Sequence, residues 1–485
     1  MSTEQHPFVD RRRFLSTAFN GIGALAASDL LARETLGASP MIASSVADPL
    51  AVRVPHLPRK AKHCIFLFMQ GGASQLDSFE YKPELNRFHG QPLPHIPAIS
   101  GELQGRLSFP HVTIGSPFAF KQYGESGKWV SDLFPATGEH ADRICFLHGM
   151  QTEGVAHGPA TLFLHCGATN NARPSMGSWL SYGLGTENQD LPAFVTISPS
   201  AGNGGVRNYN HAFLPAVYQG TPIGKAGVPF EQSKLKSLGN DTMSVSQQRR
   251  QLDLIRDLNR SQQDRRPGDN EIDALARTYE LAWRMQNNMP HVMEITGETQ
   301  ETQKLYGIDD PATADFGKKC LLARRLSESG VRFVQVTYGD NTANPAWDQH
   351  SNIEKHAVHA KAVDRPIAGL LADLAQRGLL EDTLVWWGAE FGRTPYAQQN
   401  GTGRDHNPGG FTMWLAGGGV KPGFSHGKTD DFGHLAVEGR VHLHDLHATI
   451  LHLLGIDHEK LTYRYAGRDF RLTDVHGHVV KEILS

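Results

Sequence analysis

The fold class that this sequence predicts is α/β, with a mostly parallel sheet sandwiched by helices. Short apolar runs end in glycines or polar turns, as buried strands of parallel sheets do. Stretches with helical periodicity separate these runs along the chain. Repeated strand–helix–strand units of this kind build doubly wound sheets, in which ligands bind just beyond the strand ends.

The predicted elements follow one another along most of the chain. Strands are expected at residues 62–69, 143–147, 193–197, 331–338, 384–387 and 411–416. Helices are expected at residues 162–166, 316–327, 357–377 and 442–456. Several histidines of the last helix should face solvent or the site. An antiparallel hairpin around residues 465–468 should finish the chain.

The N-terminus predicts an export signal. Arg11 and Arg12 lie shortly before Phe14 and Leu15, and a mildly apolar stretch follows, which is typical of a twin-arginine signal peptide. We therefore expect a signal at 1–47, a Pro-containing linker at 48–60 and one domain at 61–485. The alternative is a basic amphipathic helix. Export by the twin-arginine machinery would place the protein in the periplasm or outside the cell.

Residues 231–300 differ in character from the rest of the chain. They are charged, rich in Gln and helical in period, without the glycine-rich turns and apolar runs found elsewhere. We predict a helical insertion here, which could be a lid or a dimer surface.

Composition excludes several classes of protein. The chain has 47 Lys and Arg against 50 Asp and Glu, so it has no net charge that would attract nucleic acid. No apolar run is long enough to span a membrane. The four cysteines are Cys64, Cys145, Cys166 and Cys320, and each lies in or beside an apolar segment. This placement favours buried thiols over disulfides. No two of them form a CxxC pair, which argues against a zinc–thiolate site.

The stretch 384–418 carries the strongest signal for chemistry. Between its two apolar runs lie Glu390, Arg393, Arg404, Asp405 and His406, all close to predicted strand ends. Glu390 and Arg393 could instead form a buried structural pair, and His406 could cap a turn. The clustering nevertheless predicts a binding or catalytic site at this edge of the sheet.

Other predicted strand ends also carry acidic and histidine residues. Asp77 follows the first strand, and Asp348 and His350 follow the strand at 331–338. A carboxylate and an imidazole two residues apart on a loop can bind one Zn, Mn or Fe ion. Asp77 could equally be a turn or N-cap residue. His157 precedes a predicted helix, at an end where backbone N–H groups favour an anion.

Six motifs together resemble a known family. They are GGASQLD at 71–77, AHGPATLFLHCG at 156–167, WDQH at 347–350, GAEFGRTP at 388–395, GRDHNPGG at 403–410 and HDLHATILHLLGI at 444–456. The sequence resembles the uncharacterised, twin-arginine-exported, sulfatase-like family of the alkaline phosphatase superfamily, a domain of unknown function. That resemblance implies a divalent metal, such as Zn, Mn, Ca or Fe, and these ligands: Asp77, Asp348, His350, Glu390, Asp405 and His406.

The sequence also departs from that superfamily. Relatives often have Asp-His where this chain has Glu390-Phe391, so one imidazole ligand is missing and Asp405 would have to compensate. His157 occupies the position of the superfamily nucleophile, and no cysteine begins the C-x-P-x-R pattern that formylglycine sulfatases need. The usual sulfatase mechanism is therefore excluded.

Two functions remain open, with a third less favoured. The first is a metal-dependent hydrolase of sulfate or phosphate esters, acting on a small molecule or a polysaccharide. In it, Arg393 would hold the anion, helped by Ser74 and Arg404, and His157 would be general acid or nucleophile. The second is a non-catalytic protein that binds a metal, an anion or a sulfated polysaccharide. A phosphomutase-like transferase is the third.

Overall fold

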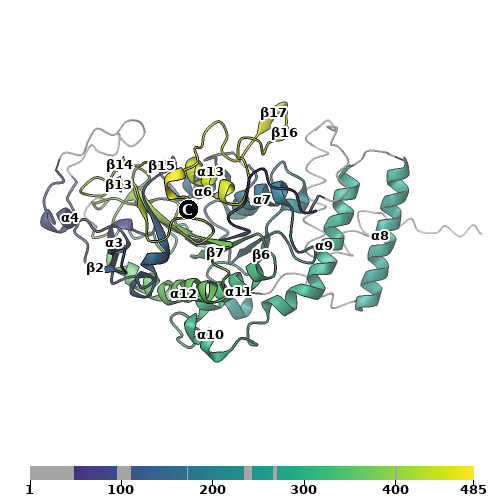
Figure 1. Ribbon diagram of the computed structural model, residues 1–485, viewed down its shortest axis with the longest axis horizontal. Helices are drawn as coiled ribbons and strands as arrows, with labels where there is room; N and C mark the ends of the chain where they lie inside the picture. Colours follow the sequence, from purple (N-terminus) through teal and green to yellow (C-terminus); the bar gives the residue numbers. More distant parts are fainter. Residues whose placement is uncertain (1–48, 95–110, 172, 234–242, 266–269, 399–400) are drawn as a thin grey trace, which may run out of the picture.

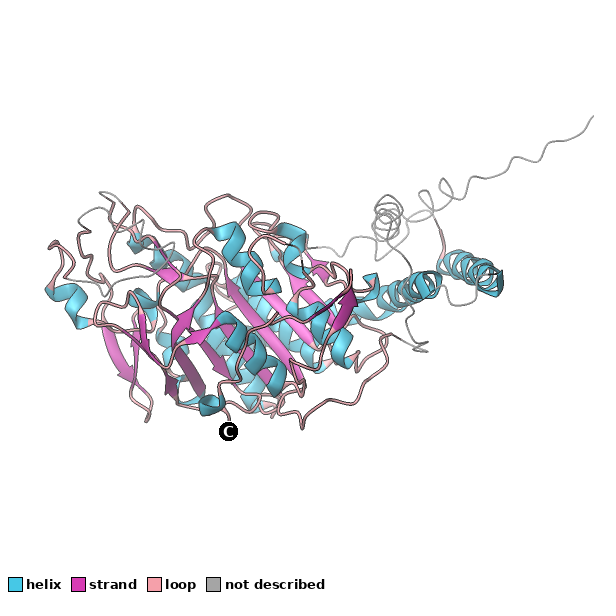
Figure 2. Ribbon diagram, turned by 90° about the horizontal axis from the view of Figure 1, so that it is seen from above, coloured by secondary structure: helices cyan, strands magenta, loops and turns pink. Residues whose placement is uncertain are grey.

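The predicted α/β class is confirmed by the computed structural model, which describes residues 49–94, 111–171, 173–233, 243–265, 270–398 and 401–485. A central sheet lies between two layers of helices (Figure 2). The predicted signal at 1–47 lies outside the described residues.

In the order of the sheet, the strands are β12 (Ser425–His426), β4 (Ile144–Gln151), β11 (Phe411–Ala416), β8 (Thr383–Gly388), β1 (His63–Met69), β7 (Phe333–Tyr338), β5 (Phe194–Ile197) and β6 (Thr221–Ile223), and β15 (Val441–His442) pairs with β4.

Helices cover both faces of the sheet (Figure 1). In that view α6 (His157–Cys166) and α13 (Leu443–Leu453) lie above the sheet, and α11 (Ala314–Glu328) and α12 (His356–Gln376) lie below it. The remaining α-helices in the described residues are α3 (Gln75–Ser78), α4 (Pro83–Arg87), α5 (Pro135–Gly138), α7 (Met176–Leu184), α8 (Val245–Arg265), α9 (Asn270–Met293) and α10 (Gln300–Leu305). Within these residues, no helix combines the length and apolar character needed to cross a membrane.

The alternation of side chains along β1 explains why helices pack on both faces. Ile65 and Leu67 belong to one hydrophobic core, which includes residues of α11 and α12. Phe66 and Phe68 belong to a second core, which includes residues of α6, α7 and α13. Successive side chains of a strand point to opposite faces, so a continuously apolar strand needs cover on both sides.

One strand differs from the prediction. Residues 411–416 were expected in a parallel sheet, but β11 is antiparallel to both β8 and β4. An apolar run buried on both faces carries no signal for its direction. The direction has a consequence for the site. The loop from β8 to β11 leaves and re-enters the sheet at one edge, and the parallel strands β1, β7 and β8 also end at that edge.

Small two-stranded sheets complete the fold. The predicted hairpin near the end of the chain is confirmed by β16 (Tyr463–Tyr465) and β17 (Arg468–Phe470), which are antiparallel. The other small sheets in the described residues pair β2 (Phe120–Tyr123) with β3 (Lys128–Ser131), β9 (Gly392–Arg393) with β10 (His406–Asn407), and β13 (Lys428–Thr429) with β14 (Ala436–Glu438).

The stretch at 231–300 contains the long helices α8 and α9, which project from one end of the sheet (Figure 1). A small separate core of Leu252, Ile255 and Tyr279 joins them, with Trp283 packed against it. The expected linker packs along the domain: Arg53 N–H donates to the Leu184 carbonyl.

The structure also tests two predictions about individual side chains. All four cysteines are free and buried, as predicted. Several histidines of α13 were expected to face solvent or the site, but His444 and His447 are both buried. His447 Nε2 donates to the Leu164 carbonyl at 2.8 Å, and burial lowers the pKa of His447 to about 4.

Candidate metal centre

Four predicted site residues meet at the edge where the parallel strands end. His157 is the first residue of α6, which follows β4. Asp348 and His350 lie in the loop after β7, and His406 lies in β10, within the loop between β8 and β11. Because β11 is antiparallel to β8, that loop is brought beside the ends of the other strands. Residues far apart in sequence therefore share one site.

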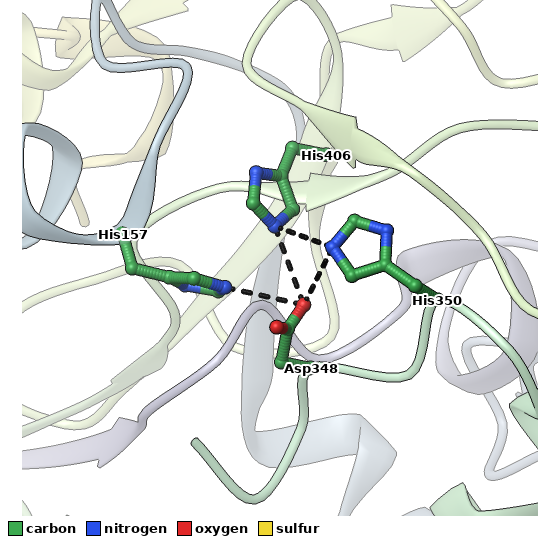
Figure 3. A group of neighbouring side chains, drawn as sticks. All are labelled: His157, Asp348, His350 and His406. Carbon is green, nitrogen blue, oxygen red and sulfur yellow. Dashed lines mark hydrogen bonds and ion pairs between the residues drawn. The ribbon is translucent and has the colours of Figure 1, made fainter. Parts of the chain in front are cut away.

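The four side chains point toward a common centre (Figure 3). Three imidazole Nε2 atoms surround one carboxylate oxygen, Asp348 Oδ1. The distances to it are 3.1 Å from His157, 2.9 Å from His350 and 3.3 Å from His406. His350 Nε2 and His406 Nε2 lie 3.0 Å from each other. Three nitrogens and one oxygen thus lie within one small space.

The other ring nitrogens are turned away from the centre toward acceptors. His406 Nδ1–H donates to the Val155 carbonyl at 2.9 Å, and His157 Nδ1–H donates to Glu390 Oε1 at 2.6 Å. His350 Nδ1 lies 3.8 Å from Asp405 Oδ1, which is too far for a hydrogen bond. A proton fixed at Nδ1 leaves the lone pair at Nε2, which is the form in which histidine binds a metal.

This arrangement fits a divalent metal. Around a tetrahedral zinc ion, ligand atoms about 2.0–2.1 Å from the metal are separated by about 3.3 Å from one another. Asp348 Oδ1 lies 2.9–3.3 Å from the three nitrogens, His350 Nε2 lies 3.0 Å from His406 Nε2, and all four atoms lie within 4.8 Å of one another. Two imidazole lone pairs facing each other are unfavourable without a cation or proton between them. Three nitrogens and one oxygen suit Zn, Mn or Fe, whereas Ca prefers oxygen ligands.

Charges around the centre are strongly coupled. Burial alone would raise the pKa of Asp348, but the contacts with His157, His350 and His406 and the Arg393 guanidinium hold it well below its usual range. Burial would lower the pKa of His157, but Asp348 and Glu390 raise it to about 9. Without a metal, the two carboxylates therefore favour the protonated form of His157.

Glu390 was expected to bind the metal directly. Its carboxylate is not part of the four-residue centre and contacts the outer nitrogen of His157 instead. Its carboxylate accepts the His157 Nδ1 proton, and it also accepts from the Gly71 backbone N–H at 3.0 and 3.1 Å. The alternative pairing of Glu390 with Arg393 is not found in the described residues. Such a carboxylate orients the imidazole and increases its basicity.

Arg393 is fully buried and bonded to protein atoms. It donates to Asp348 Oδ1 at 2.7 Å and to four backbone carbonyls, those of Gly71, Gly72, Trp347 and Arg404. These bonds join the loops that follow β1, β7 and β8. The guanidinium thus holds Asp348 in place and leaves little capacity for the predicted contact with an anion.

Asp77, Arg404 and Ser74 form a second group, separate from the four-residue centre. Arg404 donates to both carboxylate oxygens of Asp77, at 2.6 and 3.2 Å, and Ser74 Oγ donates to the same carboxylate. Burial would raise the pKa of Asp77, and Arg404 lowers it. A buried Asp–Arg pair is satisfied by itself, so the structure provides neither a metal ligand at Asp77 nor a free anion site at Arg404.

Two further groups adjoin the centre, and the sequence analysis noted only the first of them, Phe391. It packs its ring against His406 and His157 with centroids 4.3 and 5.0 Å apart. The Val155 carbonyl orients His406, and a backbone acceptor leaves no sequence signal. The Gly71-Gly72 pair was a usable signal: at Gly71, φ is +114° and a Cβ would lie 2.8 Å from the Trp347 and Asp348 nitrogens.

The fold and site define an α/β protein with a candidate metal centre at the carboxyl edge of its sheet. The chain belongs to the family described as protein of unknown function (DUF1501), which matches residues 61–484. This result confirms the expected membership in an uncharacterised family. No curated protein matches the chain.

Solved structures similar to the chain include three that span most of it. The lipoteichoic acid synthase LtaP from Listeria monocytogenes is 10% identical, with 88% of this chain and 79% of that chain covered and a TM-score of 0.36. The PsFucS1 sulfatase from Pseudoalteromonas sp. is 12% identical, with 90% and 72% covered and a TM-score of 0.36. A protein in the alkaline phosphatase superfamily from Vibrio parahaemolyticus is 11% identical, with 90% and 76% covered and a TM-score of 0.33.

Proposed function

We propose that the protein is a metal-dependent hydrolase of sulfate or phosphate esters. The observation that carries the proposal is the convergence of three imidazole Nε2 atoms and one carboxylate oxygen on one point. Four ligands from three separate loops, with the outer ring nitrogen bonded in two of the three imidazoles, form a pre-organised site. A divalent metal bound there supplies Lewis acidity, which polarises an ester oxygen and acidifies a coordinated water.

The chain's own residues hold the ligands in position. Glu390 keeps the His157 proton on Nδ1, the Val155 carbonyl does the same for His406, and Arg393 fixes Asp348. Phe391 excludes water from one side of the imidazoles. Both ring nitrogens of His157 are engaged, so we assign it to the metal rather than to general-acid or nucleophile chemistry. The nucleophile is then a water molecule.

We place this activity outside the cytoplasm. The twin-arginine pattern at Arg11 and Arg12 supports export through the twin-arginine machinery, which transports folded proteins. Such a route suits a protein whose metal ligands come together only after folding. The substrate would be a small-molecule or polysaccharide ester in the periplasm or outside the cell.

The test combines metal analysis with an ester screen. Purified protein should contain about one equivalent of divalent metal by elemental analysis, and His406→Gln should lose it while His452→Gln, on α13, keeps it. After reconstitution with Zn, Mn or Fe, the wild type should hydrolyse aryl sulfates or aryl phosphates. Failure to bind any divalent metal would refute the proposal.

The alternative is a non-catalytic binding protein on the same scaffold. It is favoured by one observation: the first position of α6 holds His157, whose ring is taken up by Asp348 and Glu390, in place of a free hydroxyl or thiol nucleophile. Metal binding without turnover of either class of ester would support this alternative over the hydrolase.

A further inference from the structure

Beside the metal centre lies a cavity of about 520 Å³. Its walls come from α4, from the segment 114–117, from the start of the 3₁₀ helix Ile353–Lys355 and from the loop at 402. Its volume is in the range of pockets that bind small ligands. The described residues that line it are Asn86, His89, Ile114, Gly115, Ser116, Pro117, Asn352, Ile353, Glu354 and Thr402.

The cavity and the centre share one wall. Asn352 lies two residues after His350, so their Cα atoms are at most about 7 Å apart. Asn352 also pairs with Thr402, and a Cβ at Gly403 would meet the Gln349 carbonyl at 2.0 Å. The loops thus pack backbone against backbone, and the wall between the centre and the cavity is only a few residues thick.

The charges of the described lining disfavour an anion. Among the described residues that line the cavity there is no Arg or Lys, and Glu354 contributes a carboxylate. A sulfate or phosphate group would be repelled here and attracted by a metal at the centre. The division suggests that the anionic end of a substrate binds at the centre and that a neutral part enters the cavity.

The polar groups of the cavity match hydroxyl groups. The Asn352 Oδ1 accepts from the Glu354 N–H at 2.9 Å, which leaves the NH₂ group of Asn352 as a donor, and Glu354 adds a carboxylate acceptor to the same lining. His89 Nδ1 accepts from the Gly115 N–H at 3.0 Å, so its proton is on Nε2, which is a second donor. A hydroxyl group both donates and accepts, and neighbouring hydroxyls satisfy neighbouring donors and acceptors.

We propose that this cavity binds a neutral, polyhydroxylated part of the substrate, such as an unsulfated sugar unit, next to the ester held at the metal centre. Ile114 and Pro117 supply apolar surface on which the C–H face of such a ring packs, and Ile353, which is only 3% exposed, lies beneath it. The inference rests on the proposed hydrolase function for its biological meaning, but binding in the cavity can be measured without turnover.

The experiment uses the isoleucine methyl groups as reporters in the metal-loaded protein. Neutral cello-, manno- and agaro-oligosaccharides are added to protein with ¹³C-labelled isoleucine δ1 methyls. At least one series should shift the Ile114 and Ile353 signals and leave Ile223 and Ile450, in the two cores, unchanged. Unchanged Ile114 and Ile353 signals with every series would overturn the inference, as would equal shifts with an apolar aryl alcohol.

Variants decide whether the lining makes the contact. Glu354→Leu and Asn86→Leu, both at exposed positions, should each weaken oligosaccharide binding by about tenfold through the loss of one or two hydrogen bonds. Glu381→Leu and Asn287→Leu, exposed and outside the lining, should not change it. Equal effects of lining and control variants would contradict the cavity as the site.

The two proposals can fail separately. If the Ile114 and Ile353 signals respond to sugars but no ester is hydrolysed, the cavity is confirmed and the hydrolase is refuted. If aryl esters are hydrolysed and the signals do not respond, only the cavity proposal fails.

Discussion

Two buried groups of charged side chains each surround one carboxylate, that of Asp348 or that of Asp373, but they differ in the hydrogen-bond donors around it. Asp373 contacts groups that always carry hydrogen: Arg324 Nε at 2.9 Å, Arg377 Nε at 2.6 Å and the Tyr306 hydroxyl at 2.9 Å. Asp348 has one such partner, Arg393, and otherwise faces three imidazole nitrogens. The first group is satisfied by itself.

The difference teaches how to distinguish a structural ion pair from a candidate metal centre. Around Asp373, both carboxylate oxygens have donors, and the contacts join α11 and α12 to Tyr306, which directly follows α10. Around Asp348, two imidazole nitrogens face each other at 3.0 Å, and both also face one carboxylate oxygen. A cation placed between these atoms satisfies all of them at once. Burial alone would not have separated the two groups.

The largest expected effect concerns Asp348. Asp348→Asn removes the only carboxylate of the four-residue centre, so metal affinity should fall by more than about 100-fold. Isothermal titration with zinc, together with elemental analysis, measures the change. Asp373→Asn is the matched control and should retain its metal. Equal metal content in the wild type and in Asp348→Asn would contradict the centre described above.

The next effect concerns Asp373, and it is a change in stability rather than in metal affinity. Asp373→Asn leaves the Arg324 guanidinium, which is only 2% exposed, without one of its carboxylates. We expect the free energy of unfolding to fall by about 3 kcal/mol, as when one partner of a buried ion pair is removed. Urea denaturation of the metal-free proteins measures it. A loss of less than about 1 kcal/mol would mean that this group is not the structural one.

A smaller effect tests the position of Glu390. Since its carboxylate holds the His157 Nδ1 proton, Glu390→Gln should lower metal affinity by about 10- to 100-fold without abolishing binding. A direct ligand, by contrast, would behave as Asp348→Asn does. Titration of the two variants side by side, with Glu381→Gln as an exposed control, distinguishes these roles.

The last effect, about tenfold for each pH unit, is the dependence of metal affinity on pH. Burial lowers the pKa of His157, but Asp348 and Glu390 raise it to about 9 in the metal-free protein. Below that pH a metal must displace this proton, so affinity should rise by about tenfold per pH unit and level off near pH 9. Chelator competition between pH 7 and pH 10 measures the slope. In Glu390→Gln the pKa of His157 falls, and the levelling should move to lower pH.

Much of the fold could be predicted from residue patterns because they are local. The apolar runs at 62–69 and 331–338 correspond to β1 and β7, and the helical period at 357–377 corresponds to α12. Residues at strand ends were also found this way: His157, Asp348, His350 and His406 were all candidates before the structure placed them together.

Other features depended on contacts that no local pattern contains. The antiparallel direction of β11 follows from its pairing with β4 and β8. The partner of Asp77, Arg404, is 327 residues away, and His444 and His447 of α13 are buried where α6 packs against them. Neither kind of partner can be read from spacing along the chain.

By itself, the sequence determined which side chains stand at the ends of the strands, since alternation and glycines fix where a buried strand stops. Only the tertiary structure decided which of them meet. Glu390 and His406 lie on one loop, yet one orients an imidazole from outside and the other points its Nε2 into the centre. That division depends on distances of a few ångströms, which are set by the packing of loops from β1, β7 and β8 against one another.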